Sequence, residues 1–270
     1  MTPETFFAAL WRQYTELTPQ AARIHGALKA RGETVLNDHV AFRTFNLAPM
    51  RLQDLEPWLL EMGYERLEPY QFPGKHLDAW GYLPRTPELP RIFFSELRVE
   101  ALPEDCQAII KGLVDQVDPD SVNGPDFFYR GLPWALPTAE EYLRLAEVSE
   151  YAAWMSVMGM RANHFTVAVH QLRSFDQLSA LNEFVKQEVE LPLNTAGGEI
   201  KGGADVCLAQ SSTLADQCRL RFRDGTDMVV PTCFYEFAQR FRLPDGSLYQ
   251  GFVANNADRI FESTDRRRAG

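Results

Sequence analysis

Two stretches of the chain decide its fold: LNDHVAFRTF at residues 36–45 and NHFTVAVH at residues 163–170. In both stretches polar and apolar residues alternate with a period of two, which is the pattern of a β-strand. Each stretch carries a histidine on the strand, and His164 comes 125 residues after His39. The two stretches therefore predict two equivalent β-strands, one in each of two repeated units.

A helix follows each predicted strand at nearly the same distance. An apolar stripe with helical spacing begins at Leu52 and stops before Gly63, a typical C-terminal cap. The second stripe begins at Phe175, which is 123 residues after Leu52. Ser174 and Gln177 have the spacing of a capping box and predict the start of this second helix.

Turn signals follow each predicted helix. Residues 64–99 contain Pro73-Gly74, Pro84, Pro87 and Pro90 between short apolar segments, which is typical of short antiparallel strands. Residues 197–203, GGEIKGG, form a glycine-rich turn at the matching place of the second unit. The sequence thus predicts an α+β fold in which two βαβββ repeats form a β-cleft or partial barrel.

The remaining segments are predicted to add helices to this core. With 270 residues the chain can bury a sizeable core, and we expect a single catalytic domain over residues 1–265. Residues 103–160 are rich in prolines and include one helix predicted over residues 139–158. The predicted parts are N-terminal helices (1–32), first repeat (33–102), helical insertion (103–160), second repeat (161–265) and a flexible basic tail (266–270).

Composition excludes several classes of partner. The chain has 27 basic and 37 acidic residues, a net charge of −10 that would repel nucleic acid. Its longest nearly apolar run, residues 152–160, is too short to span a bilayer, and Glu4 stands where a secretory signal needs basic residues. The four cysteines form no CxxC pair and are predicted to be buried, reduced thiols. We therefore expect a cytoplasmic protein, with its oligomeric state left open.

Two histidines and one glutamate are the candidate metal ligands. His39 and His164 stand at equivalent places of the two repeats, each beside small residues that leave room for a ligand. Glu236 lies within TCFYEFA (residues 232–238), where an unpaired buried carboxylate would be costly. Two imidazoles and one carboxylate leave three octahedral positions open, the arrangement that oxygen-activating Fe(II) favours.

Ordinary structural roles compete with this interpretation. A single strand histidine is more often a hydrogen-bonded core residue than a ligand, so the metal hypothesis depends on the pair. Glu236 could equally be the ion-pair partner of Arg240 or Arg221.

Arg43 is the candidate substrate-binding and catalytic residue. It lies four residues beyond His39 on the same strand face, so their Cα atoms are about 13 Å apart. Across that gap a short dicarboxylic 2-oxo acid could chelate the metal at one end and meet the guanidinium at the other. A structural salt bridge of Arg43 explains its position equally well. Lys201 and Gln210 are the next candidates for binding the substrate.

Seven segments occur in the order of one known family: DHVAFRTF (38–45), SEYAAW (149–154), NHFT (163–166), GGEIKG (197–202), QSST (210–213), YEFA (235–238) and GFV (251–253). In these the chain resembles the 2-oxoadipate dioxygenase/decarboxylase family of the vicinal-oxygen-chelate group. The resemblance implies Fe(II) held by His39, His164 and Glu236, and Arg43 binding a substrate carboxylate. It also implies conversion of 2-oxoadipate and O₂ to 2-hydroxyglutarate and CO₂, a step of lysine degradation.

Two other functions remain open from the residues. One is an isomerase or lyase of the same fold that uses Zn, Ni or Mn, which usually shows a fourth protein ligand. The other is a protein that binds a small ligand without turnover and needs no metal.

Overall fold

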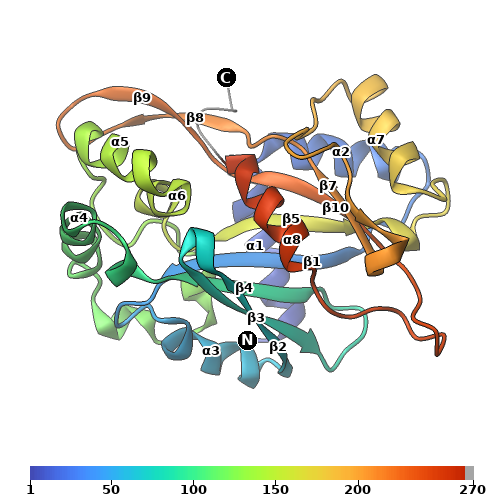
Figure 1. Ribbon diagram of the computed structural model, residues 1–270, viewed down its shortest axis with the longest axis horizontal. Coiled ribbons are helices and arrows are strands. Elements are labelled where there is room, and N and C mark those ends of the chain that lie inside the picture. Colours follow the sequence, from blue (N-terminus) through green and yellow to red (C-terminus); the bar gives the residue numbers. More distant parts are fainter. Residues whose placement is uncertain (265–270) are drawn as a thin grey trace.

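A computed structural model describes residues 1–264, except the side chains of residues 258, 259, 261 and 262, so the predicted flexible tail lies outside the described residues. Helices surround one large sheet (Figure 1). The helices are α1 (Pro3–Leu17), α2 (Pro19–Ala30), α3 (Leu52–Glu61), α4 (Glu104–Val114), α5 (Ala139–Val148), α6 (Glu150–Met158), α7 (Leu178–Gln187) and α8 (Ala254–Ile260). The strands are β1 (Asn37–Phe45), β2 (Tyr64–Phe72), β3 (Leu77–Pro84), β4 (Arg91–Leu97), β5 (Ala162–Ala168), β6 (Lys201–Gly203), β7 (Leu208–Ser212), β8 (Gln217–Arg221), β9 (Asp227–Pro231) and β10 (Phe234–Arg240).

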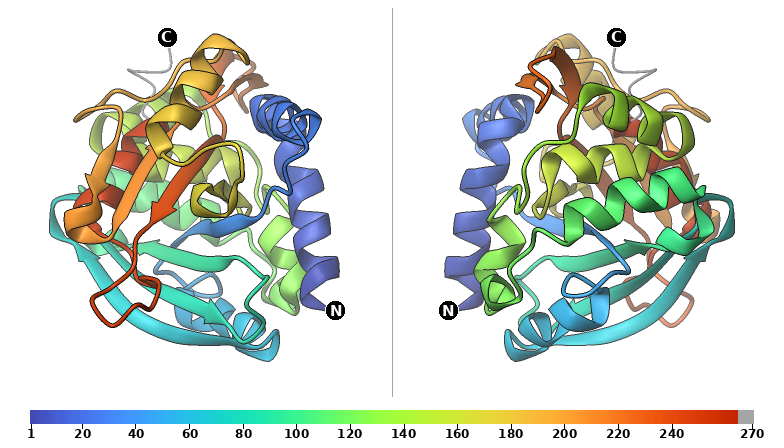
Figure 2. Two further views of the ribbon diagram at one scale, coloured as in Figure 1. Left: turned by 90° about the vertical axis from the view of Figure 1, so that its right-hand side faces the viewer. Right: turned by 90° about the vertical axis from the view of Figure 1, so that its left-hand side faces the viewer.

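The main sheet has two halves with the same strand arrangement. Its order is β2-β3-β4-β1-β5-β10-β7-β6. The first strand of each half runs parallel to the last one, β1 to β4 and β5 to β10, and antiparallel β1 and β5 join the halves. The sheet curls, as the side views show (Figure 2). This confirms the predicted α+β fold of two βαβββ units, to which the second half adds the hairpin β8–β9 between β7 and β10.

The two central strands are buried on both faces. Every residue of β5, and every residue of β1 after Asn37, is buried. On one face Phe165 packs against the rings of Trp11 and Tyr14 in α1. On the other face His164 approaches Glu236. The alternation in the sequence therefore separates an apolar layer from a polar layer, and both are shielded from water.

Helices cover the two faces of the sheet differently. α1 and α2 lie behind the sheet, on the side opposite α8 (Figures 1 and 2). Phe6, Leu10 and Tyr14 form the buried stripe of α1, as their spacing predicts. α8 contacts β2, β6 and β7, so this short helix lies across the opening between the two ends of the curled sheet.

The helix predicted over residues 139–158 is two helices. α5 ends at Val148, and Ser149 has an extended backbone with φ −150° and ψ 109°. The Ser149 hydroxyl accepts a hydrogen bond from the backbone N–H of Ala152 and caps α6. The break lets the next helix change direction and bury eight consecutive residues, 151–158, which a straight continuation of the amphipathic α5 would not.

The predicted capping box at Ser174 and Gln177 is also wrong. Helix α7 begins only at Leu178, and its N-cap residue makes no side-chain cap bond. The backbone N–H of Ser174 instead donates to the Glu33 carboxylate at 2.6 Å. The N–H of Leu178 donates to the side chain of Gln239 in β10 at 2.8 Å. The backbone N–H groups at the start of this segment are therefore bound by side chains distant in sequence, Glu33 and Gln239, and not by a local capping box.

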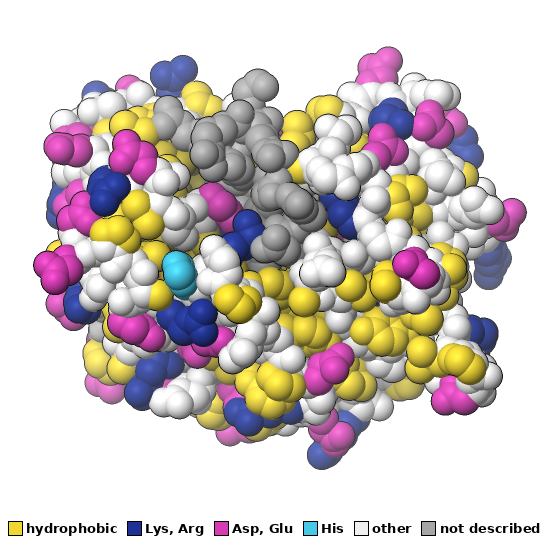
Figure 3. All heavy atoms as spheres, viewed as in Figure 1, with side chains coloured by type: hydrophobic (Ala, Val, Ile, Leu, Met, Phe, Trp, Pro, Cys, Tyr) yellow, Lys and Arg dark blue, Asp and Glu magenta, His cyan; other side chains and the backbone are white. Residues whose placement is uncertain are grey.

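The structure can be compared with the predictions made from composition about surface charge, membrane-spanning segments and cysteines. Acidic and basic side chains are interspersed on the face shown in Figure 3. Among the described residues no helix is long and apolar enough to cross a membrane. All four cysteines are free; Cys106 and Cys233 are buried as predicted, whereas Cys207 and Cys218 are partly exposed.

Candidate metal centre

Three adjacent strands bring the candidate ligands together. His39 lies on β1, His164 on β5 and Glu236 on β10, and Thr166 of β5 is the register partner of both His39 and Glu236. Laterally paired residues share a face, and so do residues two apart on one strand, so all three side chains project to one side. Their ligand atoms lie within 4.8 Å of one another, and all three residues are buried.

The preceding residue orients each imidazole. Nδ1 of His39 is 2.8 Å from a carboxylate oxygen of Asp38, and Nδ1 of His164 is 3.0 Å from the amide oxygen of Asn163. Both partner atoms are acceptors, so each Nδ1 carries the proton and donates it. Each Nε2 therefore keeps its lone pair, and it faces Glu236 at 3.4 Å from His39 and 3.1 Å from His164.

Glu236 is an ionised carboxylate in a buried place. Burial alone would raise its pKa, but His39, His164 and a hydrogen bond from Gln210 together lower the pKa below its usual value. Burial lowers the pKa of His164, against the opposing effect of Glu236. The centre thus combines a buried anionic carboxylate with two imidazoles whose Nε2 atoms face it.

The donor set fits a divalent cation. Gln210 donates to Oε1 of Glu236 at 2.6 Å, whereas Oε2 is buried and has no hydrogen-bond partner among the described residues. An unpaired buried carboxylate oxygen is costly, and a cation bound there removes the cost. Within the described part of the chain this histidine and carboxylate cluster has three members, so open coordination positions remain.

Arg240 and Arg221 do not pair with Glu236, which settles that alternative for its partner. Arg240 donates to both oxygens of Asp38, at 2.6 and 2.8 Å, and Arg221 lies 3.8 Å from Asp227. Burial would raise the pKa of Asp38, but Arg240 and His39 outweigh it and hold that pKa well below the usual range. Asp38 is the residue that the sequence argument missed. Its signal was present, because an acid precedes His39 where a neutral amide precedes His164.

A small cavity adjoins the three ligands. Its volume is about 20 Å³, room for about one water molecule. The apolar part of its wall comes from Phe93, Phe252, Ala257 and Ile260, and the rings of Phe252 and His39 are perpendicular with centroids 5.0 Å apart. The centre is therefore shielded from water by aromatic and aliphatic groups.

Arg43 lies deep beside the centre but not on the wall of this cavity. Its side chain is 1% exposed, and its positive charge contributes to lowering the pKa of His164. Nη1 lies 3.3 Å from Glu150, and the guanidinium packs over the rings of Tyr151 and Trp154 at 4.8 and 5.1 Å. The structure thus contains the salt bridge of Arg43 that competed with a substrate role, and that role stays a prediction.

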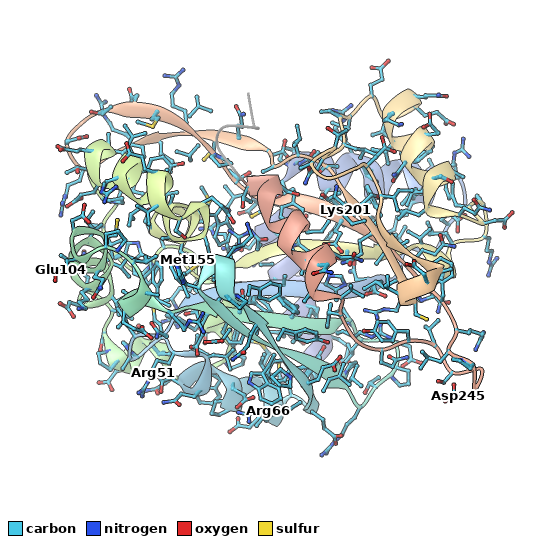
Figure 4. All side chains as sticks on the ribbon, in the orientation of Figure 1. Arg51, Arg66, Glu104, Met155, Lys201 and Asp245 are labelled. Atoms are coloured by element: carbon cyan, nitrogen blue, oxygen red, sulfur yellow. The ribbon has the colours of Figure 1, made fainter. Side chains whose placement is uncertain are left out.

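The other two candidate substrate residues differ in position. Gln210 lines the cavity and holds Glu236. Lys201 is buried and donates to the backbone carbonyl of Asn194 at 2.7 Å. In Figure 4 Lys201 lies on one side of α8 and Met155 on the other. The structure brings Gln210, but not Lys201, to the metal ligands.

One protein family matches most of the chain. The model of the family described as "2-oxoadipate dioxygenase/decarboxylase" matches residues 6–122 and 127–246. These two ranges include all the strands of the main sheet and all three candidate ligands.

Curated relatives and a solved structure carry related names. The chain is 35% identical to the chloroplastic 2-oxoadipate dioxygenase/decarboxylase of Arabidopsis thaliana, over 84% of this chain and 67% of that protein. It is 32% identical to the chloroplastic/amyloplastic protein of that name from Oryza sativa subsp. japonica, over 96% of this chain and 78% of that protein. The crystal structure of the Oryza sativa hydroxyglutarate synthase in complex with 2-oxoadipate superposes with a TM-score of 0.92 at 32% identity, covering 98% of this chain and 92% of that chain. The chain belongs to the 2-oxoadipate dioxygenase/decarboxylase family of oxygenase-type enzymes.

Proposed function

We propose that this chain converts 2-oxoadipate and O₂ to 2-hydroxyglutarate and CO₂ and that its metal is Fe(II). The observation that carries the proposal is the set of two imidazoles and one carboxylate around a water-shielded cavity, found in a member of this family. The rice relative crystallised with 2-oxoadipate supports the choice of substrate. The reaction balances, because the C1 carboxylate leaves as CO₂, one oxygen atom of O₂ enters the carboxylate formed at the former keto carbon, and the other becomes the new hydroxyl oxygen.

His39, His164 and Glu236 would hold the metal. When bound there, Fe(II) would chelate the 2-oxo acid and supply the redox chemistry that O₂ reduction needs. Asp38 and Asn163 hold the two Nδ1 protons, so both Nε2 atoms remain available as ligands. Gln210 holds one oxygen of Glu236 and leaves the other free to coordinate.

Arg43 would bind the far carboxylate of the substrate. Its guanidinium is buried on the polar side of β1, and its charge reaches His164. A carboxylate bound there receives charge-assisted hydrogen bonds in a region of low dielectric, where such bonds are strong. Phe93, Phe252 and Ile260 would exclude water around the 2-oxo end.

The pathway and the location are part of the same proposal. Lysine degradation follows from the resemblance of the motifs to the family. A cytoplasmic location stays a prediction, and the two curated plant relatives are named as chloroplastic or amyloplastic proteins.

Oxygen uptake by the reconstituted protein tests the proposal. The protein is prepared without metal, loaded anaerobically with Fe(II), and supplied with 2-oxo diacids of five to seven carbons. We expect O₂ uptake and CO₂ release in equal amounts with 2-oxoadipate, and 2-hydroxyglutarate by mass spectrometry. Absence of uptake with every diacid would reject the dioxygenase and favour the isomerase or lyase. The His164→Ala variant, loaded in the same way, is the control for iron that is not bound at this site.

A further inference from the structure

The cavity beside the metal ligands is far smaller than a substrate. Pockets that take small-molecule ligands measure about 300–1,000 Å³. The volume here is about 20 Å³. Its roof is formed by Ala257 and Ile260 of α8, so the C-terminal segment 254–264 must shift before a six-carbon diacid can reach the ligands.

Polar contacts hold this segment at both ends. The Asn256 amide donates to Gln210 at 3.0 Å, and the Ser263 hydroxyl lies within hydrogen-bond distance of Ser212 and Asn194. The last described residue, Thr264, contacts Arg43 at 3.1 Å. A segment fastened by side-chain hydrogen bonds of this kind opens at a lower free energy than the core strands do.

Glu150 and Thr264 engage the edge of Arg43 that grips carboxylates. Nη1 of Arg43 donates to Oε2 of Glu150 and Nη2 donates to the Thr264 hydroxyl, so the two terminal nitrogens have different partners. The Thr264 hydroxyl in turn donates to Oε2 of Glu150 at 2.7 Å. A free carboxylate could use both nitrogens at once, in the bidentate geometry that guanidinium groups favour.

The contact between Arg43 and Glu150 is a poor ion pair for a buried site. Its 3.3 Å distance exceeds the roughly 2.7–2.9 Å of a strong charge-assisted bond. The second oxygen of Glu150, Oε1, is buried and has no hydrogen-bond partner among the described residues. A better-placed carboxylate can therefore compete with Glu150 for the guanidinium.

We propose that Glu150 is a specificity-determining residue: it occupies the carboxylate-binding edge of Arg43 together with Thr264, and a diacid substrate replaces it and releases segment 254–264. A 2-oxo acid without a far carboxylate has no group to exchange for Glu150, so it leaves the segment fastened. A ligand shifts such an equilibrium only by its different affinity for the two states, and here the far carboxylate supplies that difference. The inference rests on the proposed function, because it takes Arg43 as the site of the far carboxylate.

Glu150→Gln tests the competition for Arg43. The amide keeps the size of the side chain and can still accept from Thr264, but it no longer competes as an anion. We expect the KM and the anaerobic Kd for 2-oxoadipate to fall about two- to tenfold. Those for 2-oxohexanoate, which has the same chain length and no second carboxylate, should change by less than about twofold. Glu147→Gln, on the exposed end of α5, is the matched control and should leave both unchanged.

Hydrogen exchange of segment 254–264 tests the fastening without turnover. In protein without the diacid, Glu150→Gln and Thr264→Val should speed amide exchange of this segment about two- to tenfold, and Glu147→Gln should not. A raised KM for the diacid in Glu150→Gln, an equal change for both acids, or unaltered exchange would each overturn the proposal. These outcomes differ from failure of the proposed function, in which the parent protein itself consumes no O₂ with 2-oxoadipate.

Discussion

The two halves of the sheet each present one histidine, yet they hold it with different chemistry. His39 donates to the ionised Asp38, which also accepts hydrogen bonds from Nε and Nη2 of Arg240. His164 donates to Asn163, whose amide nitrogen has no hydrogen-bond partner among the described residues. One imidazole therefore belongs to a buried charged network and the other to a neutral hydrogen bond. The two histidines therefore stand at equivalent backbone positions, but only His39 has a charged hydrogen-bond partner.

The halves differ again four residues beyond each histidine, farther along the same strand face. Arg43 has Ala168 as its counterpart, at the spacing of 125 residues that also separates the two histidines. Only the first half thus provides a cation at this position. Arg240, which pairs with Asp38 of the first half, comes from β10 of the second half and donates to the carbonyls of Tyr249 and Gly251. The comparison teaches that the repeat supplies the two matched histidines, while the departures from the repeat supply the charged partner of His39 and the buried Arg43, the proposed substrate-binding residue.

Removing either histidine should have the largest effect. We expect His39→Ala and His164→Ala each to weaken metal binding by at least about 100-fold, because each removes a whole ligand where loss of a supporting hydrogen bond alone costs about 10- to 100-fold. Metal content and Fe(II) titration measure it. His76→Asn is the control, since His76 has φ +56°, a conformation that asparagine tolerates. Unchanged metal binding in either alanine variant would exclude that residue as a ligand.

Arg43→Ala would place an alanine in β1 where β5 has Ala168, and would so remove the proposed binding site of the far carboxylate. We expect the preference for 2-oxoadipate over 2-oxohexanoate, as a ratio of kcat/KM, to fall roughly 30- to 1000-fold, since a charge-assisted bidentate contact is lost. Arg43→Lys keeps the charge without the fork and should retain part of the preference. Retention of the full preference in Arg43→Ala would place the far carboxylate elsewhere, with Gln210 the next residue to test.

Asp38→Asn would give His39 a neutral amide as the partner of its Nδ1, as His164 has in Asn163. We expect Fe(II) affinity to fall about 10- to 100-fold, because the His39 proton loses its charged acceptor. The buried Arg240 loses its counter-ion, so the free energy of unfolding should fall by about 3–5 kcal/mol. Metal titration and urea unfolding measure the two effects separately. Parent-like values in both would show that the charged network is dispensable and that the two halves are equivalent.

Asn163→Ala should have the smallest effect. It removes one neutral hydrogen bond, worth about 0.5–1.5 kcal/mol, so metal affinity should fall by no more than about tenfold. Fe(II) titration of this variant beside Asp38→Asn shows which hydrogen bond, that of Asp38 to His39 or that of Asn163 to His164, contributes more to metal affinity. A larger loss of metal affinity in Asn163→Ala than in Asp38→Asn would show that the neutral partner of His164 contributes more than the charged partner of His39.

Local patterns in the sequence predicted much of the framework. The period of two at residues 36–45 and 163–170 identified β1 and β5, and the stripe beginning at Leu52 identified α3. The same reasoning failed where tertiary contacts replaced local ones. Glu33, rather than a capping box, holds Ser174, and the break at Ser149 divides a segment that reads as one helix.

The sequence by itself determined that two histidines stand at matched places on repeated strands, because strand alternation and repeat spacing depend only on neighbours along the chain. It also placed Arg43 on the strand face of His39. Only the tertiary structure decided which charged groups meet there: Asp38 pairs with Arg240 and Arg43 with Glu150 and Thr264, partners 107 to 221 residues apart. It likewise decided that α8 closes the cavity. Such contacts depend on strand order, register and the curl of the sheet, so no pattern within a short window of sequence specifies them.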